Sequence, residues 1–311
     1  MKAVVTGAAG FIGSQLVERL LAERHEVVGI DAFIDFYPRS AKERNLAAAR
    51  ANPAYKFVEG RLQALELEPL LAGAQHVYHL AAQAGVRPSW GKDFAVYVDN
   101  NVSATQALLE AAVRAGAPRI IYASSSSVYG DAPSLPLREE GVCRPVSPYG
   151  VTKLAAEHLV HLYGLSQGLP VVSLRYFTVY GPRQRPDMAF HRFLKAARDG
   201  GEIHVYGDGR QTRDFTFVDD IVTATRAAGD RGRPGRVYNV GGGDRVELNH
   251  VIDEIRAVTG KDLRLVREAT QKGDMKDTLA DTGAAREDLG FRSAVSLREG
   301  LAREWDWLVR S

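Results

Sequence analysis

Largely apolar runs recur along the first part of the chain, and each is followed by a longer stretch whose apolar positions repeat at helical spacing. The runs are apolar at consecutive positions, which is typical of strands buried on both faces of a sheet. This alternation predicts an α/β fold with a parallel sheet between two helix layers. The predicted strands cover residues 2–6, 26–30, 55–59, 76–81, 119–123 and 170–176, and the longest predicted helices cover 100–115 and 149–167.

The pattern changes after Thr178. The loop at 181–187 is rich in arginine, glycine and proline, and shorter elements follow it. We predict a smaller mixed α/β C-terminal subdomain: residues 1–177 form one domain and 178–311 mainly the other, with about 215–240 returning to the first. The predicted C-terminal elements are strands at 203–206, 237–240 and 263–266 and helices at 188–199, 246–258 and 296–309.

Composition narrows the classes of function. The chain has 311 residues, of which 45% are apolar and 25% charged, and a net charge of +2. This balance gives no reason to expect nucleic acid or a membrane as a partner. The single cysteine, Cys143, excludes an intrachain disulfide framework and fits a reducing cytosol, so we expect a cytoplasmic protein. The histidines show no ligand spacing, and no metal site is expected.

Three glycines, Gly7, Gly10 and Gly13, follow the first predicted strand in the pattern G-x-x-G-x-x-G. An amphipathic stretch to about Glu23 comes next. A strand, a glycine turn and a helix open a dinucleotide-binding unit, in which the helix N-terminus attracts a pyrophosphate. The sequence therefore predicts a Rossmann-type, doubly wound sheet.

Asp31 ends the second predicted strand. A carboxylate at this point accepts hydrogen bonds from an adenosine ribose and repels a 2′-phosphate, which favours NAD over NADP. Arg39, Lys42 and Arg44 follow closely and would weaken this prediction if they faced the cofactor. We interpret them instead as the solvated face of a helix.

Hydroxyl, phenol and ammonium groups are expected at one edge of the sheet. The four serines at 124–127 follow a predicted strand and reach its carboxyl edge, where open parallel sheets bind ligands. Tyr149 and Lys153 lie four residues apart on a helix that starts near Pro148, so they share one face. In a cleft, the Lys153 ammonium would favour the Tyr149 phenolate and make it a general base. Outside a cleft, the same residues would be an ordinary helix start.

Several motifs occur in order along the chain: TGAAGFIGS at 6–14, HLAA at 79–82, SSSSVYGD at 124–131, SPYGVTK at 147–153, LRYFTVYGPRQRPDMAF at 174–190, YGDGRQTRDFTFVDD at 206–220 and YNVGGG at 238–243. Together they resemble the extended short-chain dehydrogenase/reductase family, in particular its NAD-dependent nucleotide-sugar epimerases. The resemblance covers nearly the whole chain. It is greatest for bacterial UDP-glucuronate 4-epimerases, in which GVRPSWG (here 85–91) and FTVYGPRQRPDMAF (here 177–190) are expected.

The resemblance implies a catalytic triad of Ser125, Tyr149 and Lys153, with Tyr149 as the base and Lys153 also binding the nicotinamide ribose. It implies a tightly bound NAD that is regenerated in each turnover. The family commonly has an aspartate near the adenine where this chain has Arg61, so Leu62 is expected to make that contact. The implied cofactor-binding residues are Gly7, Gly10, Phe11, Ile12, Gly13, Asp31, Leu62, Leu80, Ala81, Ala82, Tyr149, Lys153 and Phe177.

The implied reaction is 4-epimerisation of a UDP-sugar through a 4-keto intermediate, with NAD as the transient hydride acceptor. Tyr149 would remove and return the proton of the 4-hydroxyl group. Two related activities, 4,6-dehydration and uronate decarboxylation, are disfavoured. The 4,6-dehydratases carry Asp-Glu after the triad serine or threonine, and the uronate decarboxylases keep a glutamate in that loop. This chain has Ser126 and Ser127, which are neither acids nor bases at neutral pH.

Thr178 and Arg185 bear on the choice of sugar. Many hexose epimerases have asparagine at the Thr178 position, whereas threonine matches the uronate subgroup. Arg185 offers a planar fork suited to a carboxylate, although a diphosphate contact or a solvated loop charge would also explain it. At 271–274 the family's Arg-Pro-Gly-Asp reads QKGD, so Gln271 replaces the arginine and only Asp274 carries over. The implied substrate-binding residues are Arg87, Ser126, Ser127, Thr178, Arg185, Arg192, Val205, Arg213, Asn239 and Asp274.

A uronate substrate can decarboxylate during the reaction. Oxidation at C4 makes a β-keto acid, which loses CO₂ when the bond to the carboxylate aligns with the carbonyl π system. We hypothesise that Thr178 and Arg185 hold that bond out of alignment, assisted by Arg87 and the serine loop. The leading expectation is conversion of UDP-glucuronate to UDP-galacturonate. UDP-glucose or UDP-N-acetylglucosamine is the alternative substrate. A non-catalytic NAD-binding module is a remote alternative, because such proteins usually lose the tyrosine or the lysine.

Family members commonly dimerise through two helices that form a four-helix bundle, which here are the predicted helices at 100–115 and 149–167. A homodimer is therefore expected. The small and apolar residues that suit such a seam suit packing on the sheet equally well. They are Ala104, Leu108, Ala111, Leu154, Leu159 and Val160.

Overall fold

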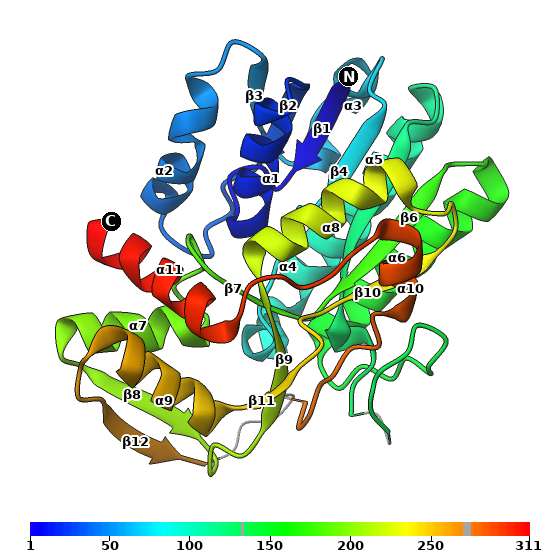
Figure 1. Cartoon of the computed structure of the whole chain (residues 1–311). Coiled ribbons are helices and arrows are strands. Elements are labelled where there is room, and N and C mark those ends of the chain that lie inside the picture. Colours follow the sequence, from blue (N-terminus) through cyan, green and yellow to red (C-terminus); the bar gives the residue numbers. More distant parts are fainter. Residues whose placement is uncertain (132–133, 270–274) are drawn as a thin grey trace.

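Parallel strands form the central sheet of the computed structural model, which describes residues 1–131, 134–269 and 275–311 (Figure 1). The strands are β1 (Lys2–Thr6), β2 (Glu26–Asp31), β3 (Tyr55–Glu59), β4 (His76–His79), β5 (Arg119–Ser125), β6 (Val171–Tyr176) and β10 (Val237–Val240). Their order across the sheet is β10-β6-β5-β4-β1-β2-β3, and every pair is parallel. The predicted Rossmann-type α/β fold is confirmed.

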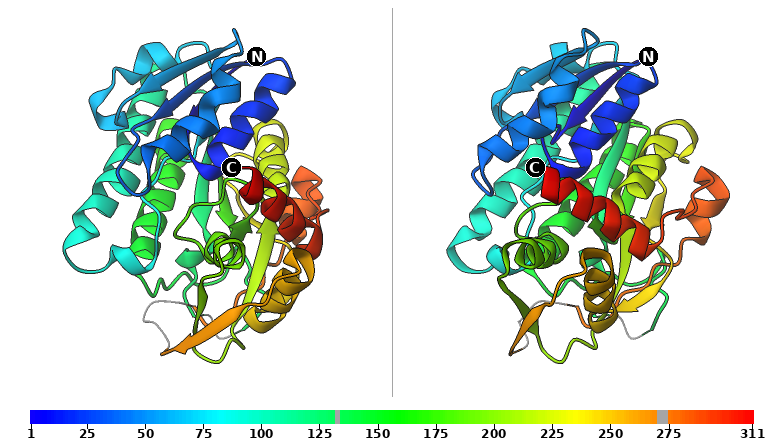
Figure 2. Two further views of the ribbon diagram at one scale, coloured as in Figure 1. Left: turned by 90° about the vertical axis from the view of Figure 1, so that its left-hand side faces the viewer. Right: turned by 60° about the vertical axis from the view of Figure 1, so that its left-hand side comes forward.

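Helices cover both faces of this sheet (Figures 1 and 2). One layer contains α1 (Phe11–Ala22), α2 (Arg39–Arg50) and α8 (Val218–Arg231), with α10 (Gly283–Leu289) beside α8. The other contains α3 (Leu67–Leu71), α5 (Ala104–Arg114) and α6 (Pro148–Gln167). Strand β1 shows why consecutive apolar residues are needed: Val5 packs into the core under α1, and Val4 packs into the core under α5.

The chain enters the sheet in its middle. From β1 it runs outward through β2 to β3, then crosses back to β4 on the other side of β1. The crevice at such a reversal, beyond the carboxyl ends of the strands, is where doubly wound sheets bind ligands. The glycine turn follows β1 at this edge, and the HLAA motif ends β4.

The C-terminal elements lie together beyond the carboxyl ends of the central strands (Figures 1 and 2). A three-stranded sheet has the order β11-β9-β7, and β8 pairs with β12. Helix α11 packs on α9 and α7. The bounds are β7 (Thr178–Tyr180), α7 (Ala189–Asp199), β8 (Glu202–Tyr206), β9 (Thr212–Phe217), β11 (Arg245–Glu247), α9 (Leu248–Thr259), β12 (Arg264–Glu268) and α11 (Leu297–Arg310).

The predicted C-terminal helices and strands are all present, but β7, β9, β11 and the helices α8 and α10 were not predicted. Strands β7 and β11 have three residues each, which is too short to show a period. Strand β10 pairs with β6 in the central sheet. The division of the chain into two domains near residue 178 stays a prediction.

The predicted helix at 100–115 is interrupted. The chain forms α4 (Phe94–Tyr97), a π-helix over Val98–Ser103 and then α5. The wider π turn places the buried Asn101 amide where it donates to Gln83 O and Thr152 Oγ1, both at 3.0 Å, and π-helices of this kind are frequent at functional sites. Short 3₁₀ helices cover Leu62–Ala64, Arg87–Ser89, Gly91–Asp93 and Ser126–Val128.

Across the three described ranges, none of the helices is both long enough and apolar enough to span a bilayer. In the same ranges, no group of three histidine, cysteine or acidic side chains is placed to hold a metal ion.

Candidate active site

Two adjoining cavities open at the carboxyl edge of the central sheet. The first, of about 220 Å³, lies over the glycine turn, and the second, of about 600 Å³, lies between the central sheet and the C-terminal elements. A few residues line both cavities and so form their junction. They are Phe11, Ile12, Ala84, Ser124, Tyr149, Tyr176 and Arg185.

The glycine turn brings two backbone segments into close contact. Gly7 has a φ of +71°, and a Cβ placed on it would lie 2.8 Å from Ala81 N. A Cβ on Gly13 would collide with Gly7 O. The turn therefore requires glycine both for its left-handed conformation and for its close packing.

A buried hydrogen-bond chain fixes the HLAA segment against this turn. Ala81 N donates to Thr6 Oγ1 (3.1 Å), which contacts His79 Nδ1 (2.7 Å), and His79 Nε2 contacts Thr105 Oγ1 (2.9 Å). Burial lowers the pKa of His79 to about 3, so the imidazole is neutral at physiological pH. His79 therefore positions the backbone of the cavity wall through this chain of hydrogen bonds.

Asp31 lies on the wall of the first cavity. Its carboxylate accepts from Ala9 N (3.0 Å) and Phe33 N (2.8 Å), and each oxygen keeps a lone pair for a ribose hydroxyl. Burial raises the pKa of Asp31, an effect that nearby Lys42 opposes. Lys42 is only 4% exposed and donates to Ile34 O (2.8 Å).

The interpretation of Lys42 as part of a solvated helix face was therefore wrong, whereas Arg39 and Arg44 are exposed as expected. Lys42 turns inward because its stem packs under the loop after β2, where its ammonium lies 4.8 Å from the centre of the Tyr37 ring. That loop adds unpredicted residues to the wall of the first cavity, namely Ile34, Phe36 and Tyr37.

The residues of the first cavity fit a dinucleotide: a glycine-lined helix N-terminus, a carboxylate for a ribose and small side chains beside the strands. Phe177 is the predicted cofactor residue that lies on the second cavity instead. Arg61 also lines the first cavity, and it forms an ion pair with Asp99 at 2.5 Å. The predicted cofactor residues on the wall are Gly7, Gly10, Phe11, Ile12, Gly13, Asp31, Leu62, Leu80, Ala81, Ala82, Tyr149 and Lys153.

Tyr149 of the proposed triad lies at the junction, with Lys153 on the first cavity and Ser125 on the second. Helix α6 starts at Pro148, where Ser147 Oγ accepts from Gly150 N (3.1 Å) and caps the first turn. This fixes Tyr149, on the first turn, and Lys153, one turn later. Ser125 ends β5 on the wall of the second cavity and makes a side-chain hydrogen bond with Tyr149.

Burial dominates the electrostatics of the triad. It raises the pKa of Tyr149, against the opposing effects of the Arg185 charge and the Ser125 hydrogen bond. It lowers the pKa of Lys153 to about 7, and Glu157 offsets part of that change. The sequence pointed to Lys153 as the cation that lowers the pKa of Tyr149, but Arg185 has this effect in the structure. Lys153 is itself close to losing its charge because it is buried.

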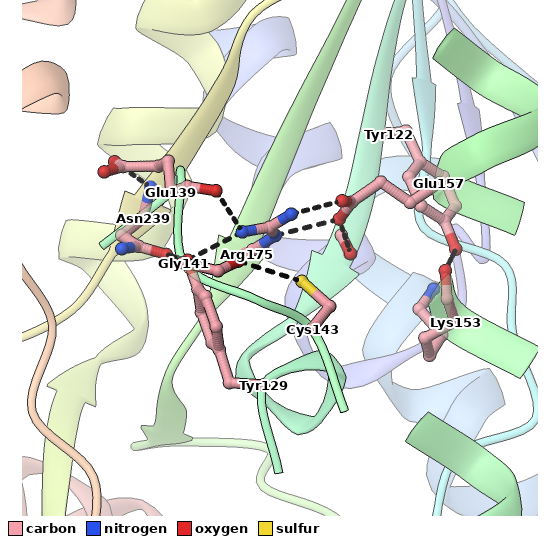
Figure 3. Close-up of polar contacts among 10 residues, drawn as sticks. Tyr122, Tyr129, Glu139, Gly141, Cys143, Lys153, Glu157, Arg175 and Asn239 are labelled. Atoms are coloured by element: carbon pink, nitrogen blue, oxygen red, sulfur yellow. Dashed lines mark hydrogen bonds and ion pairs between the residues drawn. The ribbon is translucent and has the colours of Figure 1, made fainter. Parts of the chain in front are cut away.

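A buried polar network supports α6 from behind (Figure 3). Glu157 forms an ion pair with Arg175 of β6 (2.6 Å) and accepts from Ser124 Oγ (2.5 Å). Arg175 in turn donates to Tyr129 Oη (2.8 Å), and Tyr129 donates to Asn239 Oδ1 (2.7 Å). The network ties the helix that carries Tyr149 and Lys153 to β6 and β10.

Of the nine predicted substrate residues that the structure describes, seven line the second cavity and two do not. Asn239 is fully buried, because its side chain completes the network behind α6. Val205 faces the core because alternate residues of β8 point to opposite sides, which leaves His204 and Tyr206 on the cavity. Neither residue lines this cavity, and their part in substrate binding stays a prediction. Those on the wall are Arg87, Ser126, Ser127, Thr178, Arg185, Arg192 and Arg213.

Asp274 and Gln271 lie outside the described residues. The second cavity also contains residues that the sequence analysis missed, among them Tyr206 and Gln211. The Arg87 guanidinium lies 4.1 Å from the centre of the Tyr206 ring, across the cavity mouth. Side chains alternate along β8, so the sequence indicates that His204 and Tyr206 share one face of the strand. The sequence did not reveal which face of β8 is buried.

Comparison with known proteins agrees with this geometry. The sequence model of the NAD dependent epimerase/dehydratase family matches residues 3–241. The chain is 42% identical to an uncharacterized UDP-glucose epimerase of Bacillus subtilis, covering 99% of this chain and 98% of the relative. It is 38% identical to a UDP-glucuronate 4-epimerase of Thermodesulfobacterium geofontis, covering 98% and 95%.

A solved structure agrees as well. A UDP-glucuronic acid 4-epimerase from Bacillus cereus, in complex with UDP-glucuronic acid and NAD, superposes with a TM-score of 0.97 at 43% identity and covers 100% of this chain and 99% of that one. NAD is the cofactor of the matched family, and the first cavity fits it. On its sequence and its fold, the chain belongs to the NAD dependent epimerase/dehydratase family.

Proposed function

We propose that this protein is an NAD-dependent 4-epimerase of a UDP-sugar, and that its substrate is UDP-glucuronate, with UDP-galacturonate as the product. The observation that carries the proposal is the position of Arg185. Its side chain lines both cavities, and its charge acts on the Tyr149 phenol. A guanidinium at this place can bind the carboxylate of a sugar whose 4-hydroxyl group faces Tyr149.

Residues on the walls of the two cavities divide the chemistry among them. When bound, NAD supplies the reversible oxidation of the sugar at C4. Tyr149 takes the proton of the 4-hydroxyl group and later returns it to the same oxygen. Ser125 hydrogen-bonds the phenol and Arg185 provides the positive charge that favours the phenolate. Lys153 is proposed to bind the nicotinamide ribose. Thr178 and Ser127 line the cavity near this point and are proposed to hold the sugar.

The second candidate is a 4-epimerase for a neutral sugar such as UDP-glucose or UDP-N-acetylglucosamine. Two observations favour it: the name of the Bacillus subtilis relative, and a neighbour named MoeE5 in complex with UDP-glucose and NAD, at TM-score 0.90 and 42% identity. A structure of MoeE5 with UDP-glucuronic acid and NAD also superposes on this chain, with TM-score 0.91. In the neutral-sugar case, Arg185 would have no charged partner on the sugar.

The test supplies UDP-glucuronate, UDP-glucose and UDP-xylose separately, without added NAD, and follows the products by NMR. We expect UDP-galacturonate from the first and little product from the other two, because only a uronate places a carboxylate against Arg185. Turnover without added NAD is expected because the cofactor is retained and regenerated. Equal turnover of all three sugars would contradict the proposed substrate.

We also propose a homodimer that forms through α6. The expected seam residues Ala104, Leu108, Ala111 and Val160 are buried against the sheet in this chain and are not available for it. Other apolar residues of the helix are exposed, namely Val151, Leu162 and Leu165. Light scattering of wild type and of a Leu162→Glu, Leu165→Glu variant tests the dimer, and an unchanged mass would contradict it.

A further inference from the structure

Arg185 and Asp187 form an ion pair on the wall of the second cavity. Arg185 Nε donates to Asp187 Oδ1 and Nη2 donates to Oδ2, both at 2.9 Å. The aspartate thus occupies the side-on edge of the guanidinium, made of Nε and Nη2. Among the described residues, none accepts a hydrogen bond from Nη1. The end-on edge, made of Nη1 and Nη2, can take a second carboxylate.

The two residues of the pair are placed differently. Arg185 lines both cavities and its side chain is 21% exposed, whereas Asp187 lines only the second cavity and is 37% exposed. Asp187 therefore approaches the guanidinium from the outer side. Arg185 and Tyr149 both line the junction of the cavities, and the Arg185 charge opposes the rise in the pKa of the Tyr149 phenol.

The loop that carries the pair is anchored on two sides. Arg183 donates to Glu18 of α1 (2.7 Å), and the buried Glu304 of α11 accepts from Gly181 N (2.9 Å). The backbone before Arg185 is therefore fixed, but a long arginine side chain keeps several free torsions. The two hydrogen bonds to Asp187 remove that freedom at the guanidinium itself.

We propose that Asp187 is a positioning residue for sugar specificity: it holds the side-on edge of Arg185 so that the end-on edge faces the C6 carboxylate of a uronate. This inference rests on the proposed function and deepens it. Orientation matters more here than attraction alone, because a carboxylate held by two parallel hydrogen bonds has a defined plane. That plane sets the torsion about the bond between C5 and C6.

This torsion determines whether the 4-keto sugar loses CO₂ or returns to a UDP-hexuronate. If the bond between C5 and C6 lies parallel to the carbonyl π orbitals, it breaks and releases CO₂. Its electron pair moves into an enolate over C5, C4 and the oxygen, and C5 then takes a proton from water. The by-product is a UDP-4-keto-pentose. If Arg185 keeps the bond out of alignment, the only exit is return to a UDP-hexuronate.

A rival account makes Asp187 an internal competitor that must leave Arg185 before a uronate binds. The two accounts predict opposite changes in affinity. Removing a competitor improves uronate binding, whereas removing a positioning residue weakens it and frees the carboxylate to rotate. Neither account predicts a change in the binding of UDP, which has no sugar.

The experiment compares Asp187→Asn with wild type. We expect the KM for UDP-glucuronate to rise about fivefold to tenfold, since the charge-assisted contact that orients Arg185 is lost. The share of UDP-4-keto-pentose in the products, measured by NMR, should rise at least about threefold, and the Kd for UDP should stay within about twofold. Asp187→Glu keeps the charge and should restore part of the wild-type product ratio.

Asp199 provides a matched control. It makes a similar two-point contact with Arg198, at 2.8 Å from Nε to Oδ1 and 3.4 Å from Nη2 to Oδ2. It lies at the end of α7, however, and lines neither cavity. Asp199→Asn should change neither KM nor the product ratio.

Two results with Asp187→Asn would overturn the inference while the proposed function stands. One is an unchanged KM and product ratio, which would make the pair merely structural. The other is a lower KM for UDP-glucuronate, which would make Asp187 a competitor. A wild-type enzyme that epimerises UDP-glucose and leaves UDP-glucuronate untouched would overturn the proposed substrate and this inference together.

Discussion

The two cavities recognise their ligands with different parts of the chain. The first is built mainly from backbone and small side chains, and a Cβ on Gly7 or Gly13 would collide with neighbouring backbone atoms. The second collects long polar side chains from distant segments, such as Arg87 and Arg213. Close backbone packing therefore constrains the cofactor site, whereas single side chains can be exchanged in the substrate site without changing the backbone.

The largest effect is expected where the cavities meet. Tyr149→Phe should lower kcat by about 10³-fold, because the phenyl ring cannot take the 4-hydroxyl proton. The NAD content should be unchanged, since the ring still fills the same place on the wall. NMR of the epimerisation and release of NAD by heat denaturation measure the two quantities. Activity within tenfold of wild type would show that another group is the base.

The backbone character of the first cavity is tested by adding one methyl group. Gly7→Ala should reduce NAD retention by at least about tenfold, because the new Cβ would lie 2.8 Å from Ala81 N and must push the segments apart. The Kd for UDP, measured by calorimetry, should change less than about threefold, because that ligand uses the second cavity.

Gly73→Ala is the matched control for this substitution. Gly73 has a φ of +72°, so alanine meets the same backbone strain as at Gly7, but no atom lies within 4 Å of the position that its new methyl group would take. NAD retention should be normal in this variant. Equal loss of NAD in both variants would mean that backbone strain, and not close packing at the turn, explains the effect.

The side-chain character of the second cavity is tested at Arg185. Arg185→Ala should lower kcat/KM for UDP-glucuronate by about tenfold to fiftyfold and increase the decarboxylated product, since the carboxylate loses a charged partner. Arg185→His should also increase that product. NAD retention should not change. Unchanged affinity together with no extra decarboxylation would remove Arg185 from sugar recognition.

The smallest effect concerns the buried charge of Lys153. Its folded-state pKa is about 7, below the usual 10.5, so between these values the unfolded chain binds more protons and wild-type stability rises with pH. Lys153→Met should lack this rise. In NAD-free protein, we expect the free energy of unfolding of wild type to gain about 2 kcal/mol more than that of the variant between pH 6 and pH 9. Parallel curves would contradict the lowered pKa.

The same difference between the cavities explains what the sequence could predict. Gly7, Asp31 and Tyr149 each belong to a short motif next to a regular element, so local pattern was enough to place them. Val205 and Asn239 do not line the second cavity, because the direction of each side chain depends on which face of β8 and β10 is covered by segments far away in the chain. Lys42 was misplaced for a similar reason, since only the packed loop after β2 draws it inward.

Arg185 and Asp187 are only two residues apart in the sequence. The sequence could not show, however, that their side chains form hydrogen bonds or which edge of the guanidinium stays open. Such geometry depends on rotamers and on the anchoring of the loop at Glu18 and Glu304. Local sequence motifs therefore predict the type of reaction, whereas tertiary packing determines the positions of the side chains proposed to bind the substrate.

The most direct test of this account is a crystal structure with NAD and UDP-glucuronate bound. We expect the C6 carboxylate within hydrogen-bond distance of Arg185 Nη1 and Nη2, the Asp187 contact retained on the other edge, and the sugar 4-hydroxyl oxygen at Tyr149 Oη. A diphosphate oxygen on Arg185, with the carboxylate in solvent, would contradict the account.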